Sequence, residues 1–228
     1  MPPPPAAVEV WRHVLTGAED LDALAARLSP DEAARAGRFL AEADRRRNIV
    51  ARALLRRLLG RHTGTAPQNV VIETAAQGKP FLRSGPHFSV SHSGDLIAIA
   101  VSPDHPVGID VERIDPRRDI AALAARIMSA GELAYFRALP EPARLAAFYT
   151  AWTRKEAVAK ALGDGLSRSF PGIETALDNT PPLLRHLTPA PAGIPAWTLT
   201  DLALHPGYAA ALACTGYARP GAAKQLIV

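Results

Sequence analysis

A helix followed by a His-x-Gly hairpin occurs twice along this 228-residue chain. In the first copy "ARALLRRLLG" comes before "HSGDLIAIA", which starts at His92, and in the second "RKEAVAKALG" comes before "HPGYAAALA", which starts at His205. A repeated order of helices and strands predicts an α+β fold of two similar halves, related by a pseudo-twofold axis. The turn sequence "SPDHP" divides the chain into residues 1–103 and 104–228. We expect the active site in the cleft between the halves, because ligands often bind where two such units meet.

A predicted strand in the second half, "VGIDVERI" from Val107 to Ile114, places two acids among apolar and β-branched residues. Side chains two apart in a strand point to the same face, so we expect Asp110 and Glu112 to lie side by side. Two like charges at that distance repel each other, and a bound cation is the simplest compensation. The alternative is that both acids lie on the solvent face of an edge strand.

A predicted helix further along, within "FYTAWTRKEAVAKALGDGL", supplies a third acid. Trp152, Glu156 and Lys160 follow each other one helical turn apart and therefore share one face of the helix. By itself this pattern is typical of a solvated ion pair between Glu156 and Lys160. Together with the acidic strand, Glu156 would complete an oxygen-rich site for Mg²⁺, an ion that takes its remaining ligands from water and substrate phosphates.

These segments resemble sequence blocks of the phosphopantetheinyl transferases, in particular the pseudo-dimeric type that activates surfactin-like synthetases. The paired blocks are "GIDVE" and "WTRKEAVAKALG", and they are preceded in the order of the family by "LSPDEAARAGRF", "GKPFL" and "FSVSHSGD". Several blocks in one order are more specific than any single block. The resemblance spans roughly residues 28–166. It implies a magnesium-dependent enzyme that transfers the 4′-phosphopantetheine arm of coenzyme A to a serine of an apo acyl or peptidyl carrier protein and releases adenosine 3′,5′-bisphosphate.

The same resemblance implies roles for individual residues. The magnesium ligands would be Asp110, Glu112 and Glu156. Glu156 would also be the general base, and Lys160 would hold the pyrophosphate as a point charge. The residues that would bind coenzyme A are Arg35, Gly78, Lys79, Ser91, His92, Asp110, Glu156 and Lys160, with Arg47 and Asn48 as weaker candidates. Some relatives have a second basic residue in the N-terminal helix where this chain has Glu32, so phosphate binding there would depend on Arg35 alone.

The composition is that of an ordinary globular protein, with 48% hydrophobic and 21% charged residues. The single cysteine, Cys214, excludes an internal disulfide, fits a reducing compartment and is expected in the core, as is Trp152. The sequence has neither a secretory signal pattern nor a membrane span, so we expect a cytoplasmic protein without membrane contacts. We also expect a monomer. Nucleic acid is not expected as a partner, because the arginines of the first long predicted helix lack interleaved aromatics. We interpret them as a solvated face of that helix, formed by Arg45, Arg46, Arg52, Arg56 and Arg57.

Two other classes of function stay open on the sequence. Three acids could serve a different magnesium enzyme that acts on a nucleotide or a phosphodiester without a carrier protein. A noncatalytic binding module could carry the acidic strand as a plain surface, and it should show no magnesium-dependent stabilisation in the presence of coenzyme A. The sequence does not name the carrier protein, whose acidic helix we expect to meet the surface around residues 119–139 and Phe148.

Overall fold

The computed structural model describes residues 7–163, 169–178, 183–191, 196–216 and 220–227. Within these ranges the same order of elements occurs twice: a strand, two short helices, a long helix, a 3-10 helix, a small two-stranded hairpin and two further strands. The first run consists of β1 (Glu9–Val14), α1 (Leu21–Ala25), α2 (Pro30–Ala36), α3 (Glu42–Thr63), η1 (Pro67–Asn69), β2 (Glu73–Thr74), β3 (Pro80–Phe81), β4 (His87–Ser93) and β5 (Leu96–Ser102). The second consists of β6 (Val107–Arg113), α4 (Ile120–Ile127), α5 (Ala130–Ala138), α6 (Glu141–Leu162), η3 (Phe170–Gly172), β7 (Ile173–Thr175), β8 (Leu184–Leu187), β9 (Trp197–Asp201) and β10 (Tyr208–Thr215).

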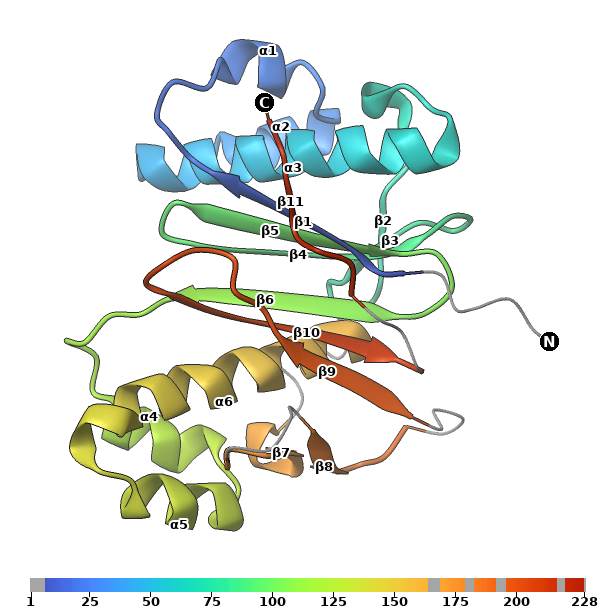
Figure 1. The fold of residues 1–228 in the computed structure, drawn as a ribbon. Helices are drawn as coiled ribbons and strands as arrows, with labels where there is room; N and C mark the ends of the chain where they lie inside the picture. The colour runs from blue at the N-terminus through green and yellow to red at the C-terminus, as the bar shows by residue number, and fades with distance from the viewer. Residues whose placement is uncertain (1–6, 164–168, 179–182, 192–195, 217–219, 228) are drawn as a thin grey trace.

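The strands of the two runs also pair in the same way. In the first half β5 lies between β1 and β4 and is antiparallel to both. In the second half β10 lies between β6 and β9 and is again antiparallel to both. Figure 1 shows the two sheets between α3 on one side and α6 on the other. The identical order and pairing confirm the predicted α+β fold of two similar halves.

The two long helices end in the same manner, although their surroundings differ. Each has 22 residues and stops at a glycine in the left-handed conformation, Gly64 with φ 66° and Gly163 with φ 82°, which residues with a Cβ rarely adopt. Helix α3 contributes Leu54 and Leu58 to a core shared with Ile97 of β5. Helix α6 instead takes part in two buried clusters, one with the β10 strand and one with α4 and α5.

Among the described helices, none combines the length and apolar content needed to cross a membrane.

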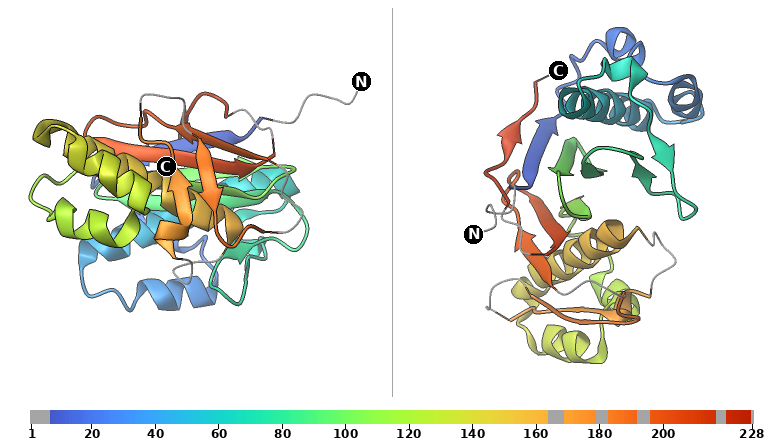
Figure 2. Two further views of the ribbon diagram at one scale, coloured as in Figure 1. Left: turned by 90° about the horizontal axis from the view of Figure 1, so that it is seen from below. Right: turned by 90° about the vertical axis from the view of Figure 1, so that its right-hand side faces the viewer.

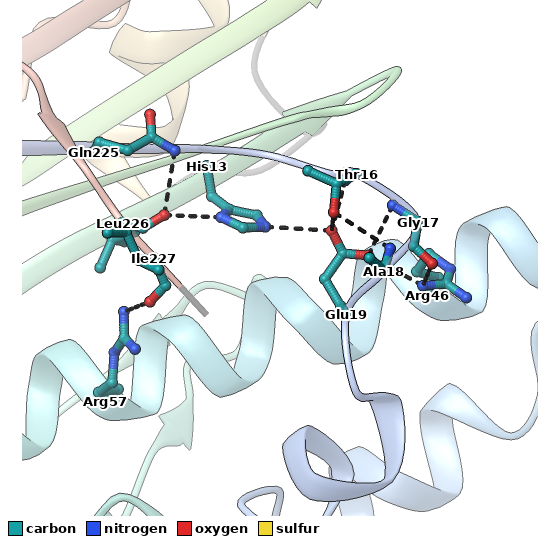
Figure 3. Close-up of polar contacts among 10 residues, drawn as sticks. All are labelled: His13, Thr16, Gly17, Ala18, Glu19, Arg46, Arg57, Gln225, Leu226 and Ile227. Carbon is teal, nitrogen blue, oxygen red and sulfur yellow. Dashed lines mark hydrogen bonds and ion pairs between the residues drawn. The ribbon is translucent and has the colours of Figure 1, made fainter.

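The end of the chain returns to the first sheet. Strand β11 (Lys224–Gln225) pairs in parallel with β1, and Leu226, which is 1% exposed, packs in the same core as α3. Figure 3 shows how this segment is held: His13 Nδ1 donates to the Leu226 carbonyl oxygen at 2.9 Å, and Arg57 donates to that of Ile227. We keep as a proposal the division of the chain after residue 103 into two halves, each with one main sheet. Strand β11 crosses this division, because it belongs to the C-terminal segment and pairs with the N-terminal sheet.

The turn after β1 is tied to the same network (Figure 3). The Glu19 side chain is 2% exposed and accepts hydrogen bonds from the backbone and hydroxyl of Thr16, at 2.6 and 3.0 Å, and from Arg46 at 3.1 Å. Burial raises the pKa of Glu19, but these hydrogen bonds outweigh it and lower the pKa to about 2. His13 Nε2 lies 3.7 Å from the same carboxylate. One acid therefore connects β1, the turn and α3.

Of the five arginines of α3 predicted to form a solvated face, Arg52 and Arg56 are covered, whereas the Arg45 side chain is 41% exposed. Arg56 is 2% exposed, forms an ion pair with Glu32 at 2.5 Å and donates to backbone carbonyls of the η1 region. Arg52 is partly buried and lies 4.0 Å from Glu32. The prediction was wrong for these two because the α2 helix and the η1 segment cover this side of α3. Glu32 is thus the acid that makes buried arginines possible there, since a buried charge needs a partner.

Three further side chains predicted from the sequence are placed by the fold. Cys214 in β10 is fully buried, as predicted. Trp152 is only partly buried and packs against Phe170, so it lies at the border of the core rather than inside it. Phe148 is 0% exposed and cannot contribute to a docking surface, because it faces the cluster formed with α4 and α5.

Candidate active site

The two halves are joined by a row of serines on β4. The alternation in "FSVSHS" puts Ser89, Ser91 and Ser93 on one face of the strand, and this face meets β6. Their hydroxyls accept hydrogen bonds from the backbone N–H groups of β6 at Ile109 (3.1 Å), Val111 (3.3 Å) and Arg113 (3.1 Å), respectively. We call this row of three hydrogen bonds the serine seam. It fixes the register of β6 against the first half.

Two serines of the seam also hold the acids of β6. The Ser91 hydroxyl donates to Asp110 Oδ1 at 2.8 Å, and the Ser93 hydroxyl donates to Glu112 Oε2 at 2.8 Å. Both acids therefore face the junction of the two halves and not open solvent. β6 is the outer strand of its three-stranded sheet, but β4 covers its other side. The alternative of two acids on a solvent face is therefore wrong, and Asp110 is 3% exposed.

Asp110 is a buried carboxylate with one oxygen satisfied and one not. Its Oδ1 accepts from Lys160 Nζ at 2.7 Å in addition to Ser91. Its Oδ2 is buried and has no hydrogen-bond partner in the described part of the chain. Burial raises the pKa of Asp110, and Lys160 works against this rise. A buried acceptor without a donor requires an explanation, and a cation is one ligand that such an oxygen would take.

The α6 helix lies directly on β6 and brings the remaining groups to this point. A Cβ atom on Gly108 would lie 1.9 Å from the Ala157 carbonyl oxygen, so only glycine allows this close approach of the helix. Trp152 Nε1 donates to Glu112 Oε1 at 3.2 Å. Burial and the nearby carboxylate of Asp110 raise the pKa of Glu156, with Lys160 opposing and Glu112 adding to the rise. Glu156 is thus in the electrostatic field of both acids of β6.

The donor set suits a hard cation, although the side chains do not form a finished coordination shell. Among the described residues, no three His, Cys, Asp or Glu side chains are close enough together to hold a metal ion as they stand. The three carboxylates nevertheless offer oxygen ligands, mutual repulsion and one unpartnered oxygen, Asp110 Oδ2. These are the features expected of a magnesium site that water and substrate phosphates would complete.

A hollow of about 290 Å³ reaches Lys160, the ion-pair partner of Asp110, although none of the three acids lines it. Its lining includes Asn48, Arg52, Lys79, His92 and Lys160. A second hollow of about 340 Å³ shares Asn48, Arg52, Gly78 and Pro80 with the first and adds Arg35 and Arg38. The two hollows therefore adjoin, and basic side chains from both halves surround them. Of the residues predicted to bind coenzyme A, Arg35, Gly78, Lys79, His92 and Lys160 line this region.

Ser91, by contrast, lies beneath the hollow, in the serine seam. Its hydroxyl donates to Asp110 and accepts from both Val111 N and Lys160 Nζ, the last at 2.9 Å. A serine hydroxyl has one donor and two acceptor positions, so all of them are used. The predicted contact of Ser91 with coenzyme A would require one of these bonds to break.

Comparison with known proteins places the chain in a family. Residues 106–213 match the model of the 4′-phosphopantetheinyl transferase superfamily, and residues 15–104 match that of the N-terminal part of a 4′-phosphopantetheinyl transferase. The 4′-phosphopantetheinyl transferase HetI of Nostoc sp. is 38% identical over 216 residues, which are 92% of this chain and 88% of the relative. The chain belongs to the 4′-phosphopantetheinyl transferase superfamily.

Further similarities are found to a second transferase and to one solved structure. The 4′-phosphopantetheinyl transferase gsp of Aneurinibacillus migulanus is 29% identical over 158 residues, 69% of this chain and 63% of the relative. A crystal structure of Thermotoga maritima holo-[acyl-carrier-protein] synthase matches with 26% identity and a TM-score of 0.39, over 51% of this chain and 64% of that one. The resemblance seen in the sequence is confirmed, and the protein is an enzyme of the transferase class.

Sequence reasoning missed two basic residues that line the hollows of the transferase. Arg38 follows the α2 helix and lines the same hollow as Arg35, and Arg52 lines both hollows. A signal for Arg52 was available, since it follows Asn48 by one helical turn and therefore shares its face of α3. Three arginines, Arg35, Arg38 and Arg52, line this hollow together with two acids, Asp31 and Glu32, so phosphate binding there would not depend on Arg35 alone.

Lys79 connects the two halves of the transferase across the hollow. It belongs to the β2–β3 hairpin, which in the right-hand view of Figure 2 descends from the α3 layer toward α6. Its Nζ donates to the Ala161 carbonyl oxygen at 2.9 Å, near the C-terminal end of α6, where helix carbonyls lack partners within the helix. Burial lowers the pKa of Lys79 to about 8. The pKa of His92, which lines the same hollow, is also lowered, because of desolvation of its ring and the nearby Arg47 guanidinium.

Proposed function

We propose that this transferase moves the 4′-phosphopantetheine arm of coenzyme A to a serine of an apo acyl or peptidyl carrier protein and releases adenosine 3′,5′-bisphosphate. The observation that carries the proposal is the position of Lys160, which lines a basic hollow and forms an ion pair with Asp110. Asp110 is one of three neighbouring carboxylates and has an unpartnered buried oxygen. A basic hollow suits the phosphates of a nucleotide, and the acids suit a cation and a proton acceptor. The family of the chain and the names of its relatives support the same reaction.

Each residue has a part in this proposal. Asp110, Glu112 and Glu156 would hold Mg²⁺, and the ion would supply positive charge to the pyrophosphate of coenzyme A. Lys160 Nζ has three donors, of which Ser91 and Asp110 use two, so one is left for a phosphate oxygen. The serine of the carrier forms a bond to phosphorus while the bond to the adenosine bisphosphate breaks. Glu156 would accept the proton of that serine hydroxyl.

We also propose that the enzyme works as a monomer in the cytoplasm and needs neither nucleic acid nor membrane. A single chain contributes both halves of the junction, β4 from the first and β6 with α6 from the second, so a second copy is not required for the site. One buried cysteine suits a reducing compartment.

The proposal is tested by incubating the purified protein with coenzyme A, Mg²⁺ and a panel of apo acyl and peptidyl carrier proteins. We expect mass spectrometry to show one phosphopantetheinyl group on the active-site serine of at least one carrier, together with stoichiometric adenosine 3′,5′-bisphosphate. Magnesium-dependent release of phosphate or nucleotide without any carrier would favour a different magnesium enzyme. Binding of coenzyme A without turnover of any carrier would favour a binding module.

Lys79 gives the proposed reaction a dependence on pH. Because its pKa is lowered to about 8, Lys79 loses its positive charge as the pH rises through that value, and attraction to a phosphate weakens. We expect kcat/KM for coenzyme A to fall between pH 7.5 and about 9.5 in the wild type. In Lys79→Arg the guanidinium stays charged over this range, so the decline should be smaller. Steady-state kinetics at several pH values measure both proteins.

The neighbours of Lys79 do not obscure this test. His87, which interacts with Lys79, and His92 in the hollow both have a pKa lowered from 6.5, so they are neutral throughout the range. Equal pH profiles for the wild type and Lys79→Arg would mean that Lys79 does not contribute its charge to coenzyme A.

A further inference from the structure

The three serines of the seam differ in one respect. Each hydroxyl accepts a backbone hydrogen bond from β6, at Ile109, Val111 or Arg113. Ser91 and Ser93 in addition donate to an acid, whereas Ser89 has no hydrogen bond to a carboxylate within the described chain. The seam thus contains two serines that contact the acids and one, Ser89, that does not and that also lines the 290 Å³ hollow.

Glu112 is held by donors from two sides. The Ser93 hydroxyl on β4 donates to Oε2 at 2.8 Å, and the Trp152 indole on α6 donates to Oε1 at 3.2 Å. The backbone N–H of Arg113 donates to the Ser93 oxygen at 3.1 Å, which directs the hydroxyl proton away from that N–H and toward Glu112. A glutamate side chain has several rotatable bonds, and these two donors restrict it to one orientation.

We infer that Ser93 is a positioning residue that orients Glu112 for the cation before the cation binds. The inference rests on the proposed function, because it takes Glu112 as a magnesium ligand. Groups that hydrogen-bond to a metal ligand fix its direction, and their loss typically lowers metal affinity about 10- to 100-fold. Ser91 has a corresponding bond to Asp110, but it also contacts Lys160, so its removal would disturb two groups at once. A substitution of Ser93 therefore removes the hydrogen bond to Glu112 without removing a contact of Lys160.

The test compares Ser93→Ala with Ser89→Ala, because both variants lose one seam hydrogen bond and only the first loses a bond to an acid. Mg²⁺ is titrated into the full-length protein with coenzyme A present and followed by calorimetry, and the magnesium dependence of carrier labelling is measured in parallel. We expect Ser93→Ala to need about 10- to 100-fold more Mg²⁺ for half-saturation in both assays, with kcat at saturating Mg²⁺ close to that of the wild type. Ser93→Thr, which keeps a hydroxyl, should recover most of the affinity.

Ser89→Ala loses a seam bond without losing a bond to an acid. Because Ser89 also lines the hollow proposed for coenzyme A, all variants are titrated at saturating coenzyme A, which keeps any change in its affinity out of the comparison. We expect Ser89→Ala to lower the urea midpoint of unfolding about as much as Ser93→Ala does and to leave the magnesium requirement near that of the wild type. Suppose that the wild type binds Mg²⁺ with coenzyme A and that Ser93→Ala and Ser89→Ala need equal Mg²⁺. This result would overturn the inference and leave the proposed function intact. A wild type without magnesium-dependent binding or transfer would overturn the proposed function and this inference with it.

Discussion

An Asp110→Ala variant is expected to remain folded and to transfer no phosphopantetheine. The substitution removes the one site carboxylate that has a buried oxygen without a partner, and with it the proposed central magnesium ligand. Folding should survive because a buried charge is costly, and its partner Lys160, whose side chain is 30% exposed, can turn to water. Mass spectrometry of the carrier measures transfer, calorimetry measures magnesium-dependent binding of coenzyme A, and urea unfolding checks the fold.

Asp115→Ala is the matched control for this variant. Asp115 follows β6 closely and pairs with Arg117 at 2.9 Å, but the arginine is 83% exposed and such surface pairs contribute little to stability. We expect this control to transfer at the rate of the wild type. Turnover of Asp110→Ala close to that of the wild type at saturating Mg²⁺ would mean that the cation is not bound at this place.

A Glu156→Gln variant is expected to bind Mg²⁺ and coenzyme A but to lose about 10²-fold or more in kcat, the usual size of a general-base contribution. Asp110 and Glu112 are anchored by the serine seam on β6, which lies between β10 and β4, and so suit coordination. Glu156 comes from α6, one helical turn before Lys160, which lines the hollow proposed for coenzyme A, and we propose that the incoming serine hydroxyl meets it there. Glutamine keeps an oxygen ligand and cannot accept the proton. Single-turnover transfer combined with calorimetry separates the two properties.

Glu141→Gln provides the control on the same helix, because Glu141 is exposed at the far end of α6. This variant should match the wild type in rate and binding. If Glu156→Gln instead loses metal and coenzyme A binding in proportion to its rate, Glu156 is a ligand only. The base would then be a water molecule or a group of the carrier protein.

Local sequence patterns were enough for the elements that carry the candidate site. The apolar and β-branched residues of "VGIDVERI" predicted a strand, and the structure has β6 there. Asp110 and Glu112 lie on one face of it, because side chains of a strand repeat every second residue. Trp152, Glu156 and Lys160 are spaced one helical turn apart, and this spacing predicted that they share one face of α6. The glycine that follows marks the end of the helix at Gly163. The repeated helix and hairpin predicted the two halves, since each element of the repeat is specified by residues close together in the chain.

The tertiary structure alone decided which of these faces meet. Ser93 and Glu112, Lys79 and Ala161, and Arg56 and Glu32 are each far apart in the sequence, yet each pair is in hydrogen-bond contact. A periodic pattern tells which side of an element is apolar, but it does not tell which other element will cover that side. For this reason Arg56 looked solvated and is buried, and Ser91 looked like a ligand contact and has every hydrogen-bonding position filled within the seam. The return of β11 to β1 depends in the same way on long-range packing, because only the assembled first core offers Leu226 a buried place.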